Sequence, residues 1–415
     1  MNSRYETAFL KISVNASAIA LCISLSLSMF VTGWPQKIFY IVSYLSFFTV
    51  LYAVFKKDIS YRHERFHLVM FLSLVFLAVV RFVWAITLKH NGIAITPTSA
   101  GIINNYLVGS KRILLGAFVI LCFSLYGYLI SRKTILISQV MITIGLVVSL
   151  GFGLYEHYYT LNYRIKMTTD ASSMASYMIA FIYCAYLGLS RLEYHRYSKH
   201  LDFVAFVLTF VLLYLCGTRI TILALIILKV TFFFIEYKVD LIKNWRVMSL
   251  VLLAVIAILG ATSSRWAQGI NDIQKYDVQS STSLGARVAI WESGIYLLHR
   301  HIGFTAPDDR TTLAREFIKT HHPQNYEGYN NVQYNMHNEF LEVTTLQGMW
   351  GAISLLLPYL ILIYGWIRKY DIKSMALPFS VLFVTGLTDS VLLFNQTATL
   401  FVMSLALCCI RKSSD

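Results

Sequence analysis

Long apolar runs separated by short polar connections make up most of the chain. A helix that spans a membrane needs about 20 predominantly apolar residues, and about a dozen such runs are present. We therefore predict an all-α integral membrane protein with about 12 transmembrane helices. The predicted spans are residues 16–33, 39–55, 68–87, 113–130, 136–155, 173–189, 203–216, 220–235, 247–262, 349–366, 375–393 and 396–410.

The composition agrees with this pattern and excludes two functional classes. Hydrophobic residues make up 57% of the chain and charged residues only 13%, which excludes a soluble enzyme and a nucleic-acid-binding protein. The net charge of +14 follows from membrane topology, because short cytoplasmic loops collect Lys and Arg. All six cysteines fall inside apolar runs, so we expect neither a disulfide framework nor a Cys/His metal site.

The distribution of Lys and Arg predicts the orientation of the chain. One set of alternate connections, which includes both terminal tails, carries far more basic residues than the other set. By the positive-inside rule this set is cytoplasmic, so both termini are cytoplasmic and the long connection after span nine is external. We divide the chain into a bundle of nine spans (1–262), an external loop domain (263–348), and spans 10–12 with a cytoplasmic tail (349–415).

The loop domain is predicted to be helical. Residues 284–298 carry apolar side chains at the spacing of an amphipathic helix that lies along the membrane surface, and a second helix is expected at about 311–320. Segment 326–335 is rich in Tyr, Asn and Gln, which suits sugar binding and a plain solvated loop about equally. The chain lacks two corresponding halves, which favours an enzyme over a transporter. The apolar positions of the first helix are Leu284, Val288, Trp291, Ile295 and Leu298.

Two arginines stand where a membrane protein rarely places them without a function. Arg219 lies in a tight external turn after Cys216, against the positive-inside trend. Arg287 precedes Trp291 by four residues, so both side chains lie near the membrane interface. The plainer alternatives are that Arg219 flanks a helix and that Arg287 snorkels beside an interfacial tryptophan.

Three more positions are candidates for chemistry or for support of the site. His337 opens the tenth span, and an imidazole, with an unperturbed pKa of about 6.5, suits general-base catalysis, although a polar helix cap is an equally simple reading. Asp389 and Arg81 lie near the outer ends of their spans. For Arg81 we predict a structural ion pair with Asp389, whereas for Asp389 this ion pair and a catalytic role are equally open. Gly348 is expected to let a neighbouring helix approach closely, as is Gly351.

Several kinds of chemistry have no motif in the sequence. A phosphate-binding glycine-rich loop, a nucleophile elbow, an H-E-x-x-H motif and an acidic metal cluster are all missing from the chain. We therefore expect neither a metal nor a cofactor. What remains is an external site with two arginines and one histidine beside apolar helices, which fits chemistry on a lipid-linked phosphate.

The chain resembles the bacterial O-antigen ligases, which belong with the O-antigen polymerases. Three stretches carry the resemblance. They are the turn 217–219, the segment from Arg287 and Trp291 to 301–304, and the sequence 337–341 followed by Gly348 and Gly351. At 301–303 the chain departs from the family, which often has a proline before this glycine-containing turn. The resemblance extends over nearly the whole chain.

This resemblance implies a fold of the helical membrane glycosyltransferase type and a site on the periplasmic face of the bacterial inner membrane. The implied reaction transfers O-antigen polysaccharide from undecaprenyl diphosphate to the lipid A-core oligosaccharide, without metal and with inversion. Arg219 and Arg287 would hold the diphosphate, and His337 would accept the proton of the attacking hydroxyl. The implied substrate contacts further include Trp291, Asn338 and Asp389.

Two other functions stay open from the sequence. An O-antigen polymerase, with a second lipid-linked glycan as its acceptor, would use similar residues. A lipid-linked oligosaccharide flippase would need a polar path through the bundle and paired halves. The sequence leaves the acceptor sugar, the O-antigen type and the oligomeric state undetermined.

Overall fold

A computed structural model describes residues 2–55, 65–90, 96–160, 163–192, 198–237, 282–300 and 303–411, with Gly260 and Ala267 besides. Within these ranges the chain is helical and contains no strand, as predicted. The upright helices are α1 (Asn2–Leu27), α2 (Trp34–Phe55), α3 (Arg65–His90), α4 (Pro97–Tyr126), α5 (Arg132–Tyr159), α6 (Ser172–Ser190), α7 (Ser198–Cys216), α8 (Arg219–Tyr237), α14 (Glu339–Ile367), α15 (Ala376–Gly386) and α16 (Asn395–Cys408).

Eleven of the predicted spans fall on these helices, and the twelfth, 247–262, lies outside the described ranges except for Gly260. Seven of the helices are long and apolar enough to cross a membrane, judged by length and composition. Three helices start well before the predicted spans: α1 at Asn2, α4 at Pro97 and α14 at Glu339. The last two have a side-chain cap, from Thr96 and Asn338 respectively, which explains where they start. The count of 12 spans remains a prediction.

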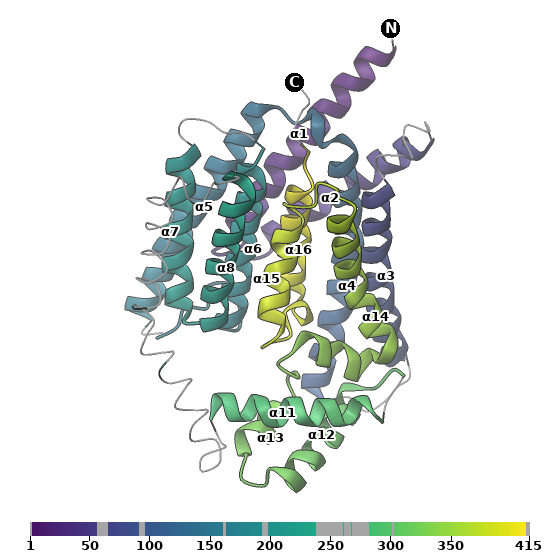
Figure 1. Cartoon of the computed structure of the whole chain (residues 1–415), viewed down its shortest axis with the longest axis vertical. Helices are drawn as coiled ribbons and strands as arrows, with labels where there is room; N and C mark the ends of the chain where they lie inside the picture. The colour runs from purple at the N-terminus through teal and green to yellow at the C-terminus, as the bar shows by residue number, and fades with distance from the viewer. Residues whose placement is uncertain are drawn as a thin grey trace.

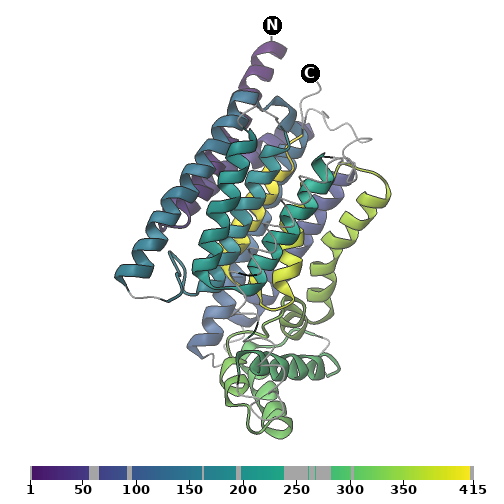
Figure 2. The same cartoon turned by 60° about the vertical axis from the view of Figure 1, so that its left-hand side comes forward.

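The upright helices form one bundle, and three helices lie beyond one end of it (Figure 1). These are α11 (Ser283–Leu298), α12 (Pro307–His321) and α13 (Tyr326–Asn331). Both chain termini lie at the opposite end, and α11 lies crosswise to the bundle axis in both views (Figures 1 and 2). The helices α11–α13 and the two termini therefore lie at opposite ends of the bundle (Figures 1 and 2).

The two helices predicted in the loop domain are confirmed, but the buried face of the first differs from the prediction. The core between α11, α12 and α14 takes Ala289, Ile290 and Leu297 from α11, whereas Ile295 of the predicted apolar stripe is half exposed. Trp291 and Leu298 of the predicted stripe are partly buried and pack against the edge of this core. Together with Ile295 they also line an apolar groove that α11 shares with α14 and α15.

Gly348 breaks α14 into two segments. Its φ of 60° and ψ of −150° lie in a region that is essentially open to glycine alone. The chain folds back so tightly that a Cβ on Gly351 would lie 2.5 Å from the carbonyl oxygen of Val343. The expectation that these glycines admit a neighbouring helix is therefore wrong for Gly351: the close neighbour is the first segment of α14 itself. The break turns that segment, which follows His337, away from the span.

Asp308 fastens the external helices to the bundle. Its carboxylate accepts hydrogen bonds from the hydroxyls of Ser99 (2.6 Å) and Thr96 (2.7 Å) and from the backbone N–H of Thr96 (3.1 Å), at the start of α4. Partial burial acts to raise the pKa of this carboxyl, but the three hydrogen bonds outweigh it and hold the pKa below its ordinary value. The ionised form is therefore the one that the fold stabilises.

We expect Asp308→Asn to lower the unfolding temperature at pH 7 by about 2–4 °C, because it weakens this contact. Because the pKa of Asp308 is lower in the folded protein, its ionised form stabilises the fold at pH values above the ordinary pKa of an aspartate. This stabilisation disappears as the pH falls through the pKa of the folded state. The difference between variant and wild type should therefore vanish in acid. Asp309→Asn, an exposed neighbour in the same helical turn, is the control. An equal difference at every pH would contradict the assignment.

Candidate active site

His337 lies in the connection between α13 and α14 and adopts a strained backbone conformation. Its φ of 48° is one of three positive values at non-glycine residues in the described part of the chain. Residues other than glycine in this region cost roughly 1–2 kcal/mol, and such strain concentrates at functional sites. The conformation persists because hydrogen bonds hold the backbone on both sides of it.

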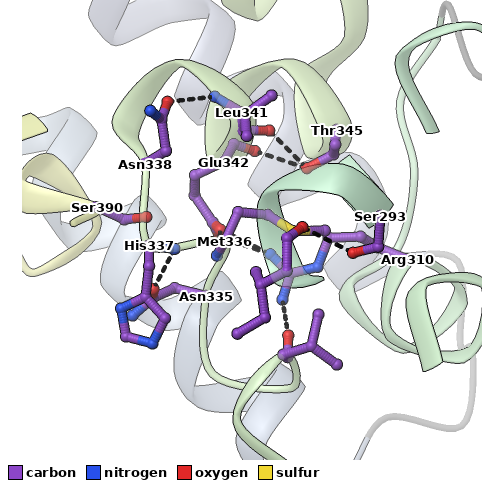
Figure 3. A network of polar contacts seen from close by, with 12 residues as sticks. Ser293, Arg310, Asn335, Met336, His337, Asn338, Leu341, Glu342, Thr345 and Ser390 are labelled. Atoms are coloured by element: carbon purple, nitrogen blue, oxygen red, sulfur yellow. Dashed lines mark hydrogen bonds and ion pairs between the residues drawn. The ribbon is translucent and has the colours of Figure 1, made fainter. Parts of the chain in front are cut away.

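Three contacts fix this backbone. The His337 N–H donates to Asn335 Oδ1 at 2.7 Å, and the His337 carbonyl accepts from the indole Nε1 of Trp291 at 2.9 Å. The preceding N–H, that of Met336, donates to Glu342 at 2.7 Å. Figure 3 shows the imidazole directed away from the Arg310–Glu342 pair. These contacts fix the position of the imidazole without using either of its ring nitrogens.

The imidazole meets a buried carboxylate. His337 Nδ1 lies 3.3 Å from Asp389 Oδ1, and the side chain of the histidine is 25% exposed while that of the aspartate is 7% exposed. Asp389 also accepts hydrogen bonds from the hydroxyl of Tyr177 (2.8 Å) and from the backbone N–H of Ser390 (2.9 Å). A carboxylate at Nδ1 favours a proton on that nitrogen, which leaves Nε2 as the acceptor. This is the arrangement of a histidine general base with an orienting carboxylate.

The predicted ion pair between Arg81 and Asp389 is wrong. Arg81 instead pairs with Glu339 at 2.9 Å, and both side chains are almost fully buried. The first turn of α14 packs on α3 and so brings the Glu339 carboxylate to the arginine, while Asp389 lies in the α15–η2 connection and faces His337. Arg81 also donates to the carbonyl of Leu392 (2.9 Å), whose N–H donates to Glu339 (2.8 Å).

This three-way contact, which we call the Arg81 clamp (Arg81, Glu339 and Leu392), joins the two segments that carry the catalytic candidates. Glu339 is two residues from His337, and Leu392 is three residues from Asp389. The clamp therefore fixes the separation of the histidine and the aspartate. A second buried pair, in which Arg310 NH1 lies 2.8 Å from both carboxylate oxygens of Glu342, holds the segment on the other side of His337.

Arg287 and His337 face one cavity of about 450 Å³. Its walls come from α11, from α13 and from the segment before α14, and Arg287 lies within electrostatic range of Asp389 and Tyr177. A permanent cation therefore stands beside the histidine and its carboxylate. The lining residues are Ser283, Ala286, Arg287, Glu327, Asn331, Tyr334 and His337.

Arg219 is not among the described residues that line this cavity. It begins α8, directly after a turn in which Gly217 has a φ of 69°. Alternation of the upright helices puts this turn at the end of the bundle that faces α11–α13 (Figure 1). The structure thus brings Arg287, His337 and Asp389 together and leaves Arg219 on the same end of the molecule.

An apolar groove of about 750 Å³ begins beside the polar cavity. Trp291 and Asn338, two of the predicted substrate contacts, lie at its polar end, and its walls come from α11, α14 and α15. The side chain of Asn338 caps α14 by accepting from the N–H groups of Phe340 and Leu341 at 3.0 and 3.1 Å. The groove and the cavity meet at consecutive residues, His337 and Asn338.

Sequence reasoning missed Tyr177, Glu342 and Arg310 as parts of this site. Tyr177 is an aromatic residue inside an apolar span, and no pattern distinguishes it from a core tyrosine. Arg310 and Glu342 lie 32 residues apart, and nothing in either neighbourhood predicts that the two side chains pair. In the described part of the chain, no group of three or more His, Cys, Asp or Glu residues is arranged to hold a metal ion.

Two comparisons with known proteins agree. Residues 204–356 match the family model described as O-antigen ligase. An O-antigen ligase from Escherichia coli (strain K12) is 22% identical over 349 residues, which cover 81% of this chain and 80% of that protein. The matched region begins within α7 and ends within α14, so it contains both arginines and the histidine of the candidate site. These matches confirm the resemblance to the O-antigen ligases that the sequence motifs indicate.

Proposed function

We propose that this protein transfers O-antigen polysaccharide from undecaprenyl diphosphate to the lipid A-core oligosaccharide on the periplasmic face of the bacterial inner membrane. The observation that carries the proposal is the cavity shared by Arg287 and His337, with Asp389 paired to the histidine and an apolar groove beside it. Such a site can hold a phosphate, a sugar and a lipid chain at once.

Arg287 binds the diphosphate of the donor. A guanidinium is always charged and offers a planar pair of donors to two phosphate oxygens, so it stabilises the negative charge that grows on the leaving group. Arg219, at the same end of the bundle, supplies a second cation. The groove between α11, α14 and α15 holds the polyprenyl chain of the donor, because it is apolar and begins at the residue after His337.

His337 acts as the general base. An acceptor hydroxyl attacks the anomeric carbon, the bond from that carbon to the phosphate oxygen breaks, and its electron pair leaves with the diphosphate. The proton of the hydroxyl passes to His337 Nε2, while Asp389 holds the ring and stabilises the imidazolium. A single displacement inverts the anomeric configuration, and confinement of both lipid-anchored substrates to one leaflet raises their effective concentration.

The proposal places both termini in the cytoplasm, at the end of the bundle opposite α11–α13. The basic tails and connections favour this orientation. In it, the cavity opens to the periplasm and the groove opens sideways to lipid. Donor and acceptor would then reach the site from the same leaflet.

The test is reconstitution of the purified protein with undecaprenyl-diphosphate-linked glycan and rough lipopolysaccharide in the presence of a chelator. We expect a ladder of glycan-bearing lipopolysaccharide on a gel, because arginines supply the charge that a metal would otherwise supply. The His337→Ala protein, assayed alongside, should give no ladder. Longer lipid-linked chains in place of the ladder would identify a polymerase, and movement of the glycan across the bilayer without any product would identify a flippase.

A further inference from the structure

The part of the cavity wall that does not come from α11 has its own chemistry. Besides His337 it consists of Glu327 and Asn331 from α13 and of Tyr334, which follows that helix. Asn331 Nδ2 donates to Glu327 Oε2 at 3.1 Å, and the ring of Tyr334 is 53% exposed. We call these three residues the α13 wall. The proposed reaction assigns no role to these three residues.

A buried asparagine fixes the α13 wall to α11. Asn325 is 1% exposed, donates to the carbonyl of Gly285 at 2.9 Å and caps α13 through the N–H of Gly328. Gly328 permits this approach, since a Cβ there would lie 3.0 Å from Asn325 Oδ1 and 3.3 Å from Ala289. Arg315 Nε also donates to the carbonyl of Tyr329, which ties α13 to α12. The wall is therefore a rigid surface built at a set distance from Arg287.

The charge of the α13 wall disfavours binding of the donor diphosphate there. The carboxylate of Glu327 repels a diphosphate, whereas the guanidinium of Arg287 attracts it. A carboxylate accepts hydrogen bonds from hydroxyl groups, and a side-chain amide both accepts and donates them, so the two together suit a pair of neighbouring hydroxyls. An exposed aromatic ring stacks on the apolar face of a pyranose. His337 lies in the same cavity, within reach of a hydroxyl on a sugar bound there.

From this arrangement we infer that the α13 wall is the subsite for the acceptor sugar, and that it takes an uncharged pyranose with neighbouring free hydroxyls. Glu327 and Asn331 hold two hydroxyls, Tyr334 stacks on the ring, and a further hydroxyl is directed at His337. The inference rests on the proposed function, since only a transferase with a sugar acceptor needs this subsite. It also assigns acceptor choice to three residues.

The experiment measures acceptor binding apart from catalysis. In lipid nanodiscs, rough lipopolysaccharide is titrated into the catalytically silent His337→Ala protein, with and without a second substitution. We expect Glu327→Gln and Tyr334→Ala each to weaken this binding about 10-fold or more, because each removes a direct sugar contact. The double variant with Tyr334→Phe should bind rough lipopolysaccharide nearly as tightly as His337→Ala alone, since it keeps the aromatic ring. Tyr326→Ala, at an exposed position of the same helix outside the cavity, is the matched control.

The same substitutions in the active protein distinguish the acceptor from the donor. Glu327→Gln and Tyr334→Ala should raise the KM for rough lipopolysaccharide about 10-fold while the KM for the lipid-linked glycan stays within twofold. A rise in the donor KM instead would assign the wall to the donor glycan, and wild-type values for both variants would leave it no sugar-binding role. Either outcome overturns the inference while wild-type ligation still supports the proposed function; absence of wild-type ligation would reject the function itself.

Discussion

The Arg287→Ala protein is expected to transfer O-antigen at least about 1,000-fold more slowly than the wild type. An arginine that stabilises charge on a phosphate in the transition state contributes a factor of about 10³–10⁵ to the rate. Arg287 is the cation that lines the cavity beside His337, so a variant without it leaves the departing diphosphate without this partner. Single-turnover ligation in proteoliposomes, followed by the appearance of glycan-bearing lipopolysaccharide, measures the loss.

Two further variants show whether the loss comes from the guanidinium itself. Arg287→Lys should recover little of the rate, because an ammonium cannot hold two phosphate oxygens in the planar geometry of arginine. Arg300→Ala removes an exposed arginine just beyond the end of α11 and should behave as the wild type. A rate for Arg287→Ala within tenfold of the wild type would remove this residue from the mechanism.

Arg81→Met is expected to be the most destabilising of the single substitutions considered. It leaves the carboxylate of Glu339 buried without its cation, and the loss of one partner of a buried ion pair costs about 3–5 kcal/mol. The substitution also removes the hydrogen bond to the Leu392 carbonyl and leaves the Leu392 N–H to Glu339 as the remaining contact of the clamp, so the distance between His337 and Asp389 is held less firmly. We expect a lower unfolding temperature in detergent together with a large loss of ligation.

A double variant separates the two effects. Arg81→Met combined with Glu339→Gln removes both charges, so most of the stability should return. Ligation should stay low, because the clamp that positions the catalytic pair is still absent. Arg65→Met, at the other end of α3, is the matched control. Full activity in the double variant would show that the clamp serves stability alone.

The sequence predicts the helices well because a run of apolar residues is a local property. It also marks Arg287 and His337, since polar groups next to apolar runs stand out from their surroundings. The partner of Arg81 could not be predicted, because Glu339 and Asp389 are equally plausible until the packing of α14 on α3 is known. The same limit applies to α11: hydrophobic spacing predicts the helix, but it does not show that Ala289, Ile290 and Leu297 form its core face while Trp291 and Leu298 lie at the edge of the core.

The role of Gly348 was missed for a related reason. A glycine in a predicted span is compatible with close packing of two helices and with a break in one helix, and only the backbone angles distinguish these cases. Here the break decides where the first segment of α14 lies, and with it the position of His337. Local pattern therefore identifies candidate groups for the site, while their mutual geometry depends on contacts between distant segments.

The size of the cavity beside Arg287 bears on how the enzyme treats polymers of different length. A volume of about 450 Å³ is that of a site for a small molecule, so only the few sugar units next to the diphosphate can occupy it. In the proposed reaction the remainder of the polysaccharide would extend away from the site without contact to it. The enzyme would then transfer short and long chains with equal ease, and the distribution of chain lengths on the cell surface would be set before the glycan arrives.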